Sequence, residues 1–139
     1  MKEHKEVKQY IIVRTDLPMN TGKVAAQASH ASMKVFFDKF EKSEIENSEG
    51  IFEEAMFFTP TKEEKKWIEG KFTKVVKKVK NENQLLKVYN KAKEVGLNAS
   101  LIKDAGLYGL EGENYTCVAV GPNYVDDCEP IVKKLRLLT

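Results

Sequence analysis

The sequence predicts an α/β fold, a single-domain α/β/α sandwich built on a mixed sheet. Segments with strand and helix patterns alternate along the chain in the order β, α, β, α, β, β, α. The last two strands are joined by a loop instead of a helix, which indicates a mixed sheet. The chain has 139 residues, of which 42% are hydrophobic, enough for one core and too few for two comfortable domains.

The first half of the chain begins with an apolar strand and a long helix. The strand is predicted at Val7–Val13, and the helix runs from Thr21 to about Phe40. A second strand, Lys71–Val79, is rich in Val and Lys. Its lysines are typical of a strand at the edge of a sheet.

The second half contains the clearest helix. The stretch "NENQLLKVYNKAKEVG" places apolar residues on one face, with Asn81 or Asn83 as the N-cap and Gly96 as the stop. Two strands, "ASLIKDAG" and "YTCVAVGP", follow, joined by a loop with several glycines. The stretch "DDCEPIVKKL" forms a short last helix.

The middle of the chain, residues 41–61, has the least regular pattern. It combines the polar, acidic "EKSEIENSEG" with the apolar "IFEEAMFF", which stops at Pro60. We predict a loop that carries a short helix packed on the core.

Composition excludes several classes of protein. The net charge of +2, with 32% charged residues, by itself predicts neither a nucleic-acid nor a membrane partner. The N-terminal "MKEHKEVKQ" lacks the apolar core of a signal peptide, and no apolar run approaches membrane-spanning length. We therefore expect a cytoplasmic protein without a membrane partner. Cys117 and Cys128 have no metal or redox spacing and are expected to be reduced and mostly buried.

The first helix has two different faces at about 100° per residue. One face is apolar and is predicted to be buried; it consists of Val24, Ala28, Ala31 and Val35, extended by Ala25, Ser32 and Phe36. The other face is a polar stripe of Lys23, Gln27, His30 and Lys34. A solvated helix face is the simpler interpretation of such a stripe.

Lys23 supports a binding site instead. It lies in the first helical turn, where the macrodipole opposes a cation and the backbone N–H groups attract an anion. Together they predict a phosphate or oxyanion site, and the small Ala and Ser residues let the helix lie close to the sheet.

A P-loop is excluded because Leu17 occupies the position of its first glycine. With His4 and His30 as the only histidines and no Cys/His cluster, we expect no metal site.

Asp104 is the second candidate, because it ends the strand in "LIKDAG" just before a glycine turn. Functional side chains in open α/β sheets gather at strand ends beside helix N-termini. Lys23 and Asp104 are therefore placed to meet. The alternative interpretation of Asp104 is an ordinary turn-forming aspartate, which is common before glycine.

These pieces together resemble a known family. The stretches "TGKVAAQASHAS", "GLNASLIKDAG", "TCVAVGP" and "KKLRLL", with Trp67 after the first of them, occur in this order through most of the chain. The sequence resembles the peptidyl-tRNA hydrolases of the archaeal and eukaryotic type. The resemblance implies an α/β fold with a mixed four-stranded sheet, often dimeric, that hydrolyses the ester between a peptide and tRNA without a cofactor.

The resemblance also implies site residues. Lys23 and Asp104 match the family's catalytic lysine and aspartate. Gln27 and His30 match positions that line the same region, and Lys34 is the next polar residue of that stripe. We expect these last three side chains to bind substrate.

Two departures from the family pattern concern the same site. The pattern D-A-G-x-T includes the expected substrate-binding Gly106, but Tyr108 stands in place of its threonine. The tyrosine hydroxyl either takes over the role of the threonine in catalysis or its ring blocks the site. Residues 41–61 look longer than the family's usual connection, which predicts an insertion in the single domain 1–139 that covers or reshapes the substrate groove.

Ester hydrolysis needs a positioned water, a group that takes its proton, and positive charge where the oxyanion develops. Lys23 and the helix N-terminus supply the positive charge, and Asp104 orients the water or holds Lys23. Lysines in "TKEEKKWIEGKFTKVVKKVK" and "KKLR" suit contacts with tRNA phosphates, although about half are expected to be simply solvated or edge-protecting. The leading prediction is hydrolysis of peptidyl-tRNA, and the alternative is a catalytically impaired RNA-binding relative of the same fold.

Overall fold

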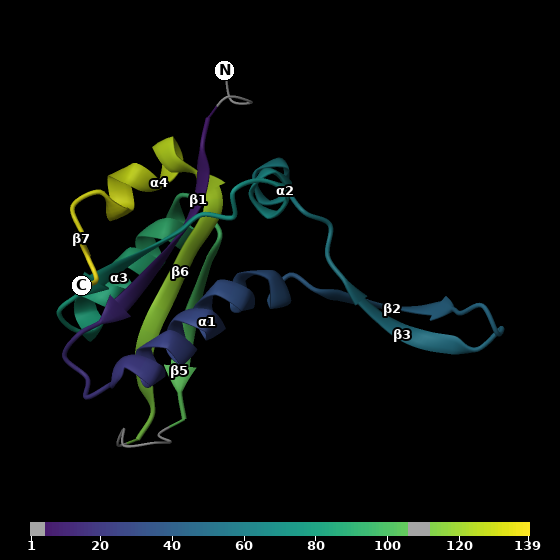
Figure 1. The fold of residues 1–139 in the computed structure, drawn as a ribbon, viewed down its shortest axis with the longest axis horizontal. Coiled ribbons are helices and arrows are strands. Elements are labelled where there is room, and N and C mark those ends of the chain that lie inside the picture. Colours follow the sequence, from purple (N-terminus) through teal and green to yellow (C-terminus); the bar gives the residue numbers. More distant parts are fainter. Residues whose placement is uncertain (1–4, 106–111) are drawn as a thin grey trace.

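Five strands form a mixed sheet with helices on both faces (Figure 1). The computed structural model describes residues 5–105 and 112–139. In spatial order, the strands are β5 (Ala99–Asp104), β6 (Asn114–Tyr124), β1 (Val7–Arg14), β4 (Lys74–Val79) and β7 (Arg136–Leu137). The helices are α1 (Thr21–Phe37), α2 (Lys62–Glu69), α3 (Glu82–Glu94) and α4 (Val125–Val132). The predicted α/β fold with a mixed sheet is confirmed.

The sheet has five strands, one more than the four that the resemblance implied, and the additional strand is β7. β1 pairs parallel with β4 and antiparallel with β6, which in turn pairs antiparallel with β5. β7 has two residues and pairs with Lys77 and Lys78 of β4. β4 is therefore interior where β7 covers it, so its predicted edge position was wrong there. A strand of two residues is too short to leave a periodic pattern in the sequence.

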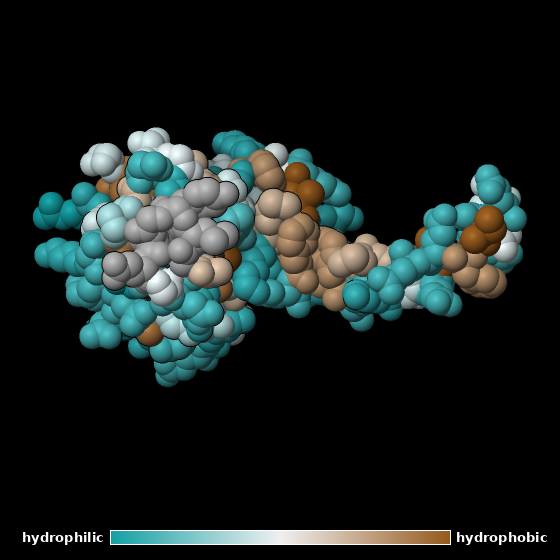
Figure 2. Space-filling model, turned by 90° about the horizontal axis from the view of Figure 1, so that it is seen from below, coloured by the Kyte–Doolittle hydropathy of each residue, from teal (hydrophilic) through white to brown (hydrophobic). Residues whose placement is uncertain are grey.

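Residues 41–57 form an arm that projects from the body (Figure 1). Its strands, β2 (Glu41–Glu46) and β3 (Phe52–Phe57), pair antiparallel as a hairpin, so the predicted loop was wrong. The turn is stabilised by Asn47, whose side-chain oxygen accepts hydrogen bonds from the N–H groups of Glu49 and Ile51. Gly50 completes the turn with φ at 78°, a conformation that favours glycine. Figure 2 shows apolar residues running from the body onto this arm.

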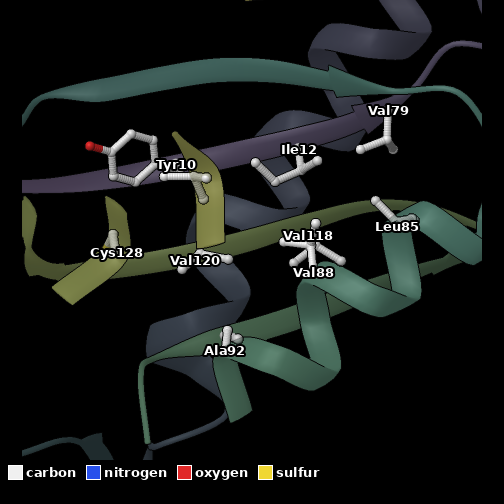
Figure 3. Close-up of a cluster of buried hydrophobic side chains, with 11 residues drawn as sticks. Tyr10, Ile12, Val79, Leu85, Val88, Ala92, Val118, Val120 and Cys128 are labelled. Carbon is white, nitrogen blue, oxygen red and sulfur yellow. The ribbon is translucent and has the colours of Figure 1, made fainter. Parts of the chain in front are cut away.

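The core is divided by the sheet into two clusters, because successive residues of a strand point to opposite faces. Tyr10 and Ile12 of β1 face α3 and α4, where they join a cluster that includes Leu85, Val88 and Val118 (Figure 3). The next residues along β1, Ile11 and Val13, face α1 and belong to a second cluster with Ala31, Val35 and Ala119. The continuous apolar run of β1 thus reflects a strand buried on both faces.

The two cysteines lie in opposite clusters, Cys117 on the α1 side and Cys128 on the α4 side. Both are free and buried, as predicted. Burial raises the pKa of each thiol to about 12. Both side chains are therefore neutral packing groups at neutral pH.

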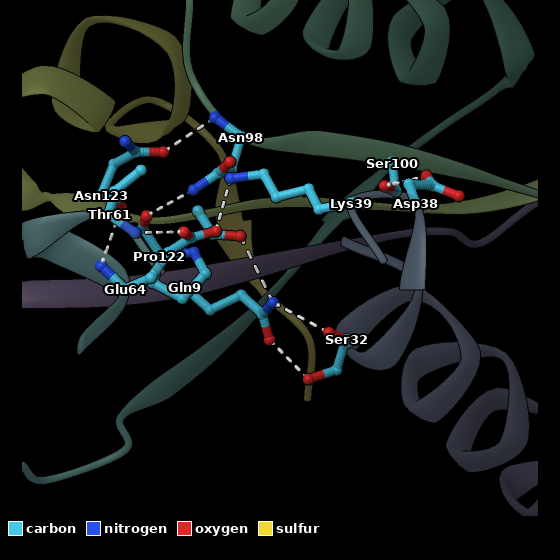
Figure 4. A network of polar contacts seen from close by, with 11 residues as sticks. Gln9, Ser32, Asp38, Lys39, Thr61, Glu64, Asn98, Ser100, Pro122 and Asn123 are labelled. Atoms are coloured by element: carbon cyan, nitrogen blue, oxygen red, sulfur yellow. Dashed lines mark hydrogen bonds and ion pairs between the residues drawn. The ribbon is translucent and has the colours of Figure 1, made fainter. Parts of the chain in front are cut away.

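A buried carboxylate joins the two ends of the arm (Figure 4). Glu64 of α2 has no exposed surface, and its Oε2 lies 2.5 Å from Nζ of Lys39, just before β2. Its Oε1 accepts a hydrogen bond from the N–H of Thr61, just after β3, at 2.8 Å. The hydroxyl oxygen of Thr61 in turn accepts a hydrogen bond from the Glu64 N–H, which completes a capping box for α2. We call Lys39, Thr61 and Glu64 the arm clamp.

Aromatic rings pack beside the arm clamp. Phe58, just after β3, contacts Phe36 of α1 and Phe40, with ring centroids 5.4 and 5.5 Å away. Phe36 also stacks on Trp67, which is 1% exposed. The base of the arm is therefore packed from both of its strands, while the strands beyond it are almost entirely exposed.

Candidate active site

Lys23 and Asp104 meet at the start of α1 and the end of β5. Nζ of Lys23 lies 2.8 Å from Oδ2 of Asp104, and the two side chains are 12% and 7% exposed. The position of Lys23 is fixed by the N-cap, since the side-chain oxygen of Asn20 accepts a hydrogen bond from the Lys23 N–H at 2.9 Å. The prediction that these two side chains can meet is confirmed.

Gln27, one turn further along α1, links the pair to the sheet. Its Nε2 donates to Oδ2 of Asp104 at 3.2 Å, and its Oε1 accepts from the hydroxyl of Thr116 on β6 at 2.5 Å. The Thr116 bond sets which end of the amide faces Asp104, so the same carboxylate oxygen receives both Lys23 and Gln27. Thr116 was not predicted. Its signal in the sequence is a hydroxyl inside the apolar run "YTCVAV", because a buried hydroxyl needs a hydrogen-bond partner.

A pocket of about 320 Å³ lies beside the pair. It is lined by Pro18, Asn20, Gly22, Lys23 and Ala26. The Lys23 side chain therefore separates a buried carboxylate from a space that a small group can enter. A cation in such a position, next to the N–H groups of a helix N-terminus, suits an oxyanion or a phosphate oxygen.

The remaining polar residues of α1 diverge from this arrangement. His30 is exposed, whereas Lys34 donates to Oδ1 of Asp38 at 2.6 Å. Asp38 also accepts from the Ser100 hydroxyl at 2.7 Å, so Lys34 belongs to a separate ion pair near the C-terminal end of the helix. The structure brings Lys23, Gln27 and Asp104 together but not Lys34.

One detail of the predicted helix faces was wrong: Ala25 is exposed although it was predicted on the buried face. Gln27 of the polar stripe is 3% exposed, so the solvated interpretation of the stripe does not hold at this residue. The burial of its amide is compensated by hydrogen bonds to Asp104 on β5 and Thr116 on β6. Gly106 and Tyr108 lie outside the residues that the structure describes. Within residues 5–105 and 112–139, no group of three or more His, Cys, Asp or Glu side chains is arranged to hold a metal ion.

Comparison with known proteins identifies the family. The model of the family "Peptidyl-tRNA hydrolase PTH2" matches residues 7–138. The chain belongs to this family. A peptidyl-tRNA hydrolase of Sulfolobus acidocaldarius is 36% identical over 133 residues, covering 95% of this chain and 100% of the relative. A peptidyl-tRNA hydrolase of Methanocaldococcus jannaschii is 35% identical over 132 residues, with the same coverage of both chains. The PTH2 match thus includes both α1 and β5, which supply the Lys23–Asp104 pair.

In the part of the chain that the structure describes, no helix has both the length and the apolar character needed to cross a bilayer.

Proposed function

We propose that this chain hydrolyses the ester bond between the peptide and the tRNA of peptidyl-tRNA and so returns tRNA to translation. The observation that supports it best is the Lys23–Asp104 pair beside an open pocket in a chain of the PTH2 family. Because peptidyl-tRNA is formed during translation, we place the protein in the cytoplasm. The resemblance to a family that is often dimeric supports a homodimer, which analytical ultracentrifugation tests directly.

The proposed mechanism needs no cofactor. A water molecule attacks the ester carbonyl carbon, and the carbonyl oxygen becomes an oxyanion that the Lys23 ammonium and the α1 N-terminus stabilise. Asp104 holds Lys23 in place and orients the water, with Gln27 holding the carboxylate. The new C–O bond to water forms, the C–O bond to the ribose breaks, and the proton of the water passes to the ribose oxygen. The role of Asp104 is thus to position Lys23 and the water molecule, more than to act as a general base.

Sequence position supports roles for further residues. Gly106 and Tyr108 follow Asp104 by two and four positions in the sequence, so we propose a substrate-binding role for Gly106 and a catalytic role for Tyr108. His30, exposed on the α1 face next to Lys23, is placed along the substrate. We assign Lys34 a weaker role in substrate binding because Asp38 already engages it.

A basic groove on the other side of the sheet suits the tRNA backbone. This groove, of about 780 Å³, lies between α3, α4 and the ends of β4 and β7. It has six cationic side chains and an apolar floor; the cations are Lys78, Lys80, Lys87, Lys91, Lys134 and Arg136. Of the described residues that line it, none is acidic. Clustered cations bind phosphates without reading sequence, and affinity then falls as salt rises.

The groove is tested by charge reversal. We expect K87E/K91E to weaken tRNA affinity about tenfold and to lower the slope of log affinity against log salt by about 0.9 per lost contact. Lys42→Glu, which reverses an exposed charge on the arm, is the matched control. An unchanged salt slope in the groove variant would place the tRNA elsewhere.

The activity is tested by incubating the purified protein with peptidyl-tRNA in the presence of EDTA and measuring the release of free tRNA. Hydrolysis is expected. Binding without release would favour the alternative, an RNA-binding relative in which Tyr108 blocks the site. Tyr108→Thr separates these cases: it raises a very low rate if the ring blocks the site, and it leaves a comparable rate if the hydroxyl replaces that of the threonine. Whatever change Tyr108→Thr makes, from a large rise to a modest alteration, we expect it in the hydrolysis rate more than in tRNA affinity.

A further inference from the structure

Charge divides the molecule into two ends. The arm, residues 41–57, contains six glutamates and one lysine and so carries −5, which leaves +7 on the rest of a chain whose net charge is +2. The basic groove lies beside β4 and β7, at one edge of the sheet, whereas the arm extends from the far end of α1 (Figure 1). The Lys23–Asp104 pair lies at the start of that helix. A polyanion is drawn to the groove and repelled from the arm.

A mostly apolar strip, which includes His30, runs from the candidate active site along α1 to the arm. Ala26, His30, Met33 and Phe37 are exposed and recur at spacings of three and four, so they form one stripe along α1, starting next to Lys23. Met33 and Phe37 are 52% and 54% exposed. The arm adds exposed large apolar residues on both of its faces: Phe52 and Met56 on one face, Ile45 and Phe57 on the other, and Ile51 beside the turn. Figure 2 shows apolar residues at the base and at the tip of the arm. Exposed apolar strips of this extent mark binding surfaces.

The arm also offers unpaired backbone. Within the described residues, β2 and β3 pair only with each other, so each has an open edge. An extended peptide can add to such an edge through main-chain hydrogen bonds, whatever its sequence. The hairpin also gains from an added strand, because two-stranded sheets are marginal in water and Glu44 faces Glu54 directly across this one. The arm clamp and the rings around Phe58 hold its base in place.

We propose that the exposed stripe of α1 and the arm bind the peptide moiety of peptidyl-tRNA. The inference rests on the proposed function. The substrate has a polyanionic end and a peptide end joined by the ester, and the protein has a basic groove and an acidic, apolar arm on either side of the Lys23–Asp104 pair. Because nascent peptides have no common sequence, recognition through a strand edge and nonspecific apolar contacts fits this occupant. The six glutamates further favour peptides with Lys or Arg.

The dimensions predict how the rate depends on peptide length. From Lys23 to Phe37 the helix rises about 21 Å at 1.5 Å per residue. An extended peptide covers about 3.4 Å per residue, so about six residues reach the end of α1 and about six more reach the tip of the arm. We expect kcat/KM to rise with peptide length and to level off near about twelve residues.

The test compares two substrates on each protein: N-acetylaminoacyl-tRNA, which has a single residue, and a tRNA that carries a twelve-residue peptide. The measured quantity is the ratio of kcat/KM for the long substrate to that for the short one. In the arm deletion, a short Gly-Ser linker replaces residues 41–57, which is feasible because Glu41 and Phe57 are paired neighbours. We expect the ratio to fall about tenfold, the equivalent of burying about one large apolar side chain.

A second variant keeps the arm residues 41–57, although it removes the contact between the rings of Phe37 and Phe40, whose centroids lie 5.3 Å apart. M33S/F37S removes the two large apolar side chains of the α1 stripe. We expect it to lower the same ratio about threefold to fivefold, because each side chain is about half exposed in the free protein and so can bury only that half against a peptide. Val95→Ser is the matched control: this valine is 54% exposed but lies at the C-terminal end of α3, outside the strip. Its ratio is expected to equal that of the wild type.

The outcomes are distinguishable. If the wild type fails to hydrolyse even the short substrate, the proposed function fails. If it hydrolyses both and the ratio is the same with and without the arm, the peptide assignment is overturned. An arm deletion that changes oligomeric state in ultracentrifugation but not the ratio would assign the arm to a second copy of the chain and would also overturn the proposal.

Discussion

Two ion pairs in this molecule have the same chemistry and different surroundings. Lys23 bonds Asp104 at 2.8 Å beside a pocket, whereas Lys39 bonds Glu64 at 2.5 Å at the base of the arm. Glu64 also caps α2, so its two oxygens serve two structural partners. In the first pair, a lysine in a helical first turn lines an open space. The difference indicates that the neighbours of an ion pair, and not the pair itself, decide whether it lines an accessible pocket or joins structural elements.

The largest expected effect is on stability at the structural pair. Glu64→Ala removes a fully buried carboxylate that satisfies Lys39 and the N-terminus of α2, and such losses cost about 3–5 kcal/mol of unfolding free energy. Urea denaturation measures it. Glu64→Gln keeps an oxygen for the Thr61 N–H and should lose less. Equal urea midpoints for the wild type and Glu64→Ala would show that the arm clamp contributes nothing to stability.

The next effect is on turnover at the other pair. Lys23→Ala should lower kcat roughly 10²-fold or more, the size of effect seen when one oxyanion-stabilising donor is removed, while the fold survives. The control is Lys39→Ala, which removes the lysine of the structural pair and should alter urea stability more than turnover. A folded Lys23→Ala enzyme with wild-type kcat would remove this lysine from the mechanism and erase the distinction between the pairs.

The sequence predicted the contact between Lys23 and Asp104 but not the contact between Gln27 and Thr116. Lys23 and Asp104 were predictable because each lies where a local pattern changes, at a helix start and a strand end, and α/β topology brings such ends together. Gln27 and Thr116 were missed as a bonded pair because their contact depends on which residue of β6 lies under α1. That register is a tertiary property, invisible to periodicity along one segment.

The arm was misread for a different reason. Both faces of the hairpin are exposed, so its strands lack the alternation of apolar and polar residues that burial on one side imposes. The local turn signal at Asn47 and Gly50 and the capping box of Thr61 and Glu64 were both present in the sequence. Only the three-dimensional structure shows that Lys39, before the arm, joins Glu64, after it.

A smaller effect is expected from the Thr116 hydroxyl, which contacts the Lys23–Asp104 pair through Gln27. Thr116→Val is nearly isosteric but leaves the Gln27 amide without the donor that orients it, so we expect a loss of about 1 kcal/mol in stability. Turnover should fall a few-fold, because Gln27 then holds Asp104 less firmly. Thr73→Val makes the same substitution at a residue just before β4, whereas Thr116 lies in β6, and is the control. Wild-type turnover in Thr116→Val would show that the hydrogen bond from the Thr116 hydroxyl is not needed to orient the Gln27 amide.

The smallest effect concerns a third lysine–carboxylate pair, Lys34–Asp38, which is about half exposed and serves as a reference for the other two. Burial opposes ionisation of Asp38, but hydrogen bonds from Lys34 and Ser100 outweigh it and lower the pKa of Asp38 below its usual value. A carboxyl group with a lowered folded-state pKa stabilises the protein above its unfolded-state pKa, near 3.9, and loses that contribution as pH falls through the folded-state value. Asp38→Asn should therefore cost a few tenths of a kcal/mol at pH 7, as is usual for exposed i,i+4 pairs, and less as the pH drops below about 4. Urea midpoints of both proteins between pH 7 and pH 3 measure this, and a difference that grows toward acid pH would reverse the sign of the assigned shift.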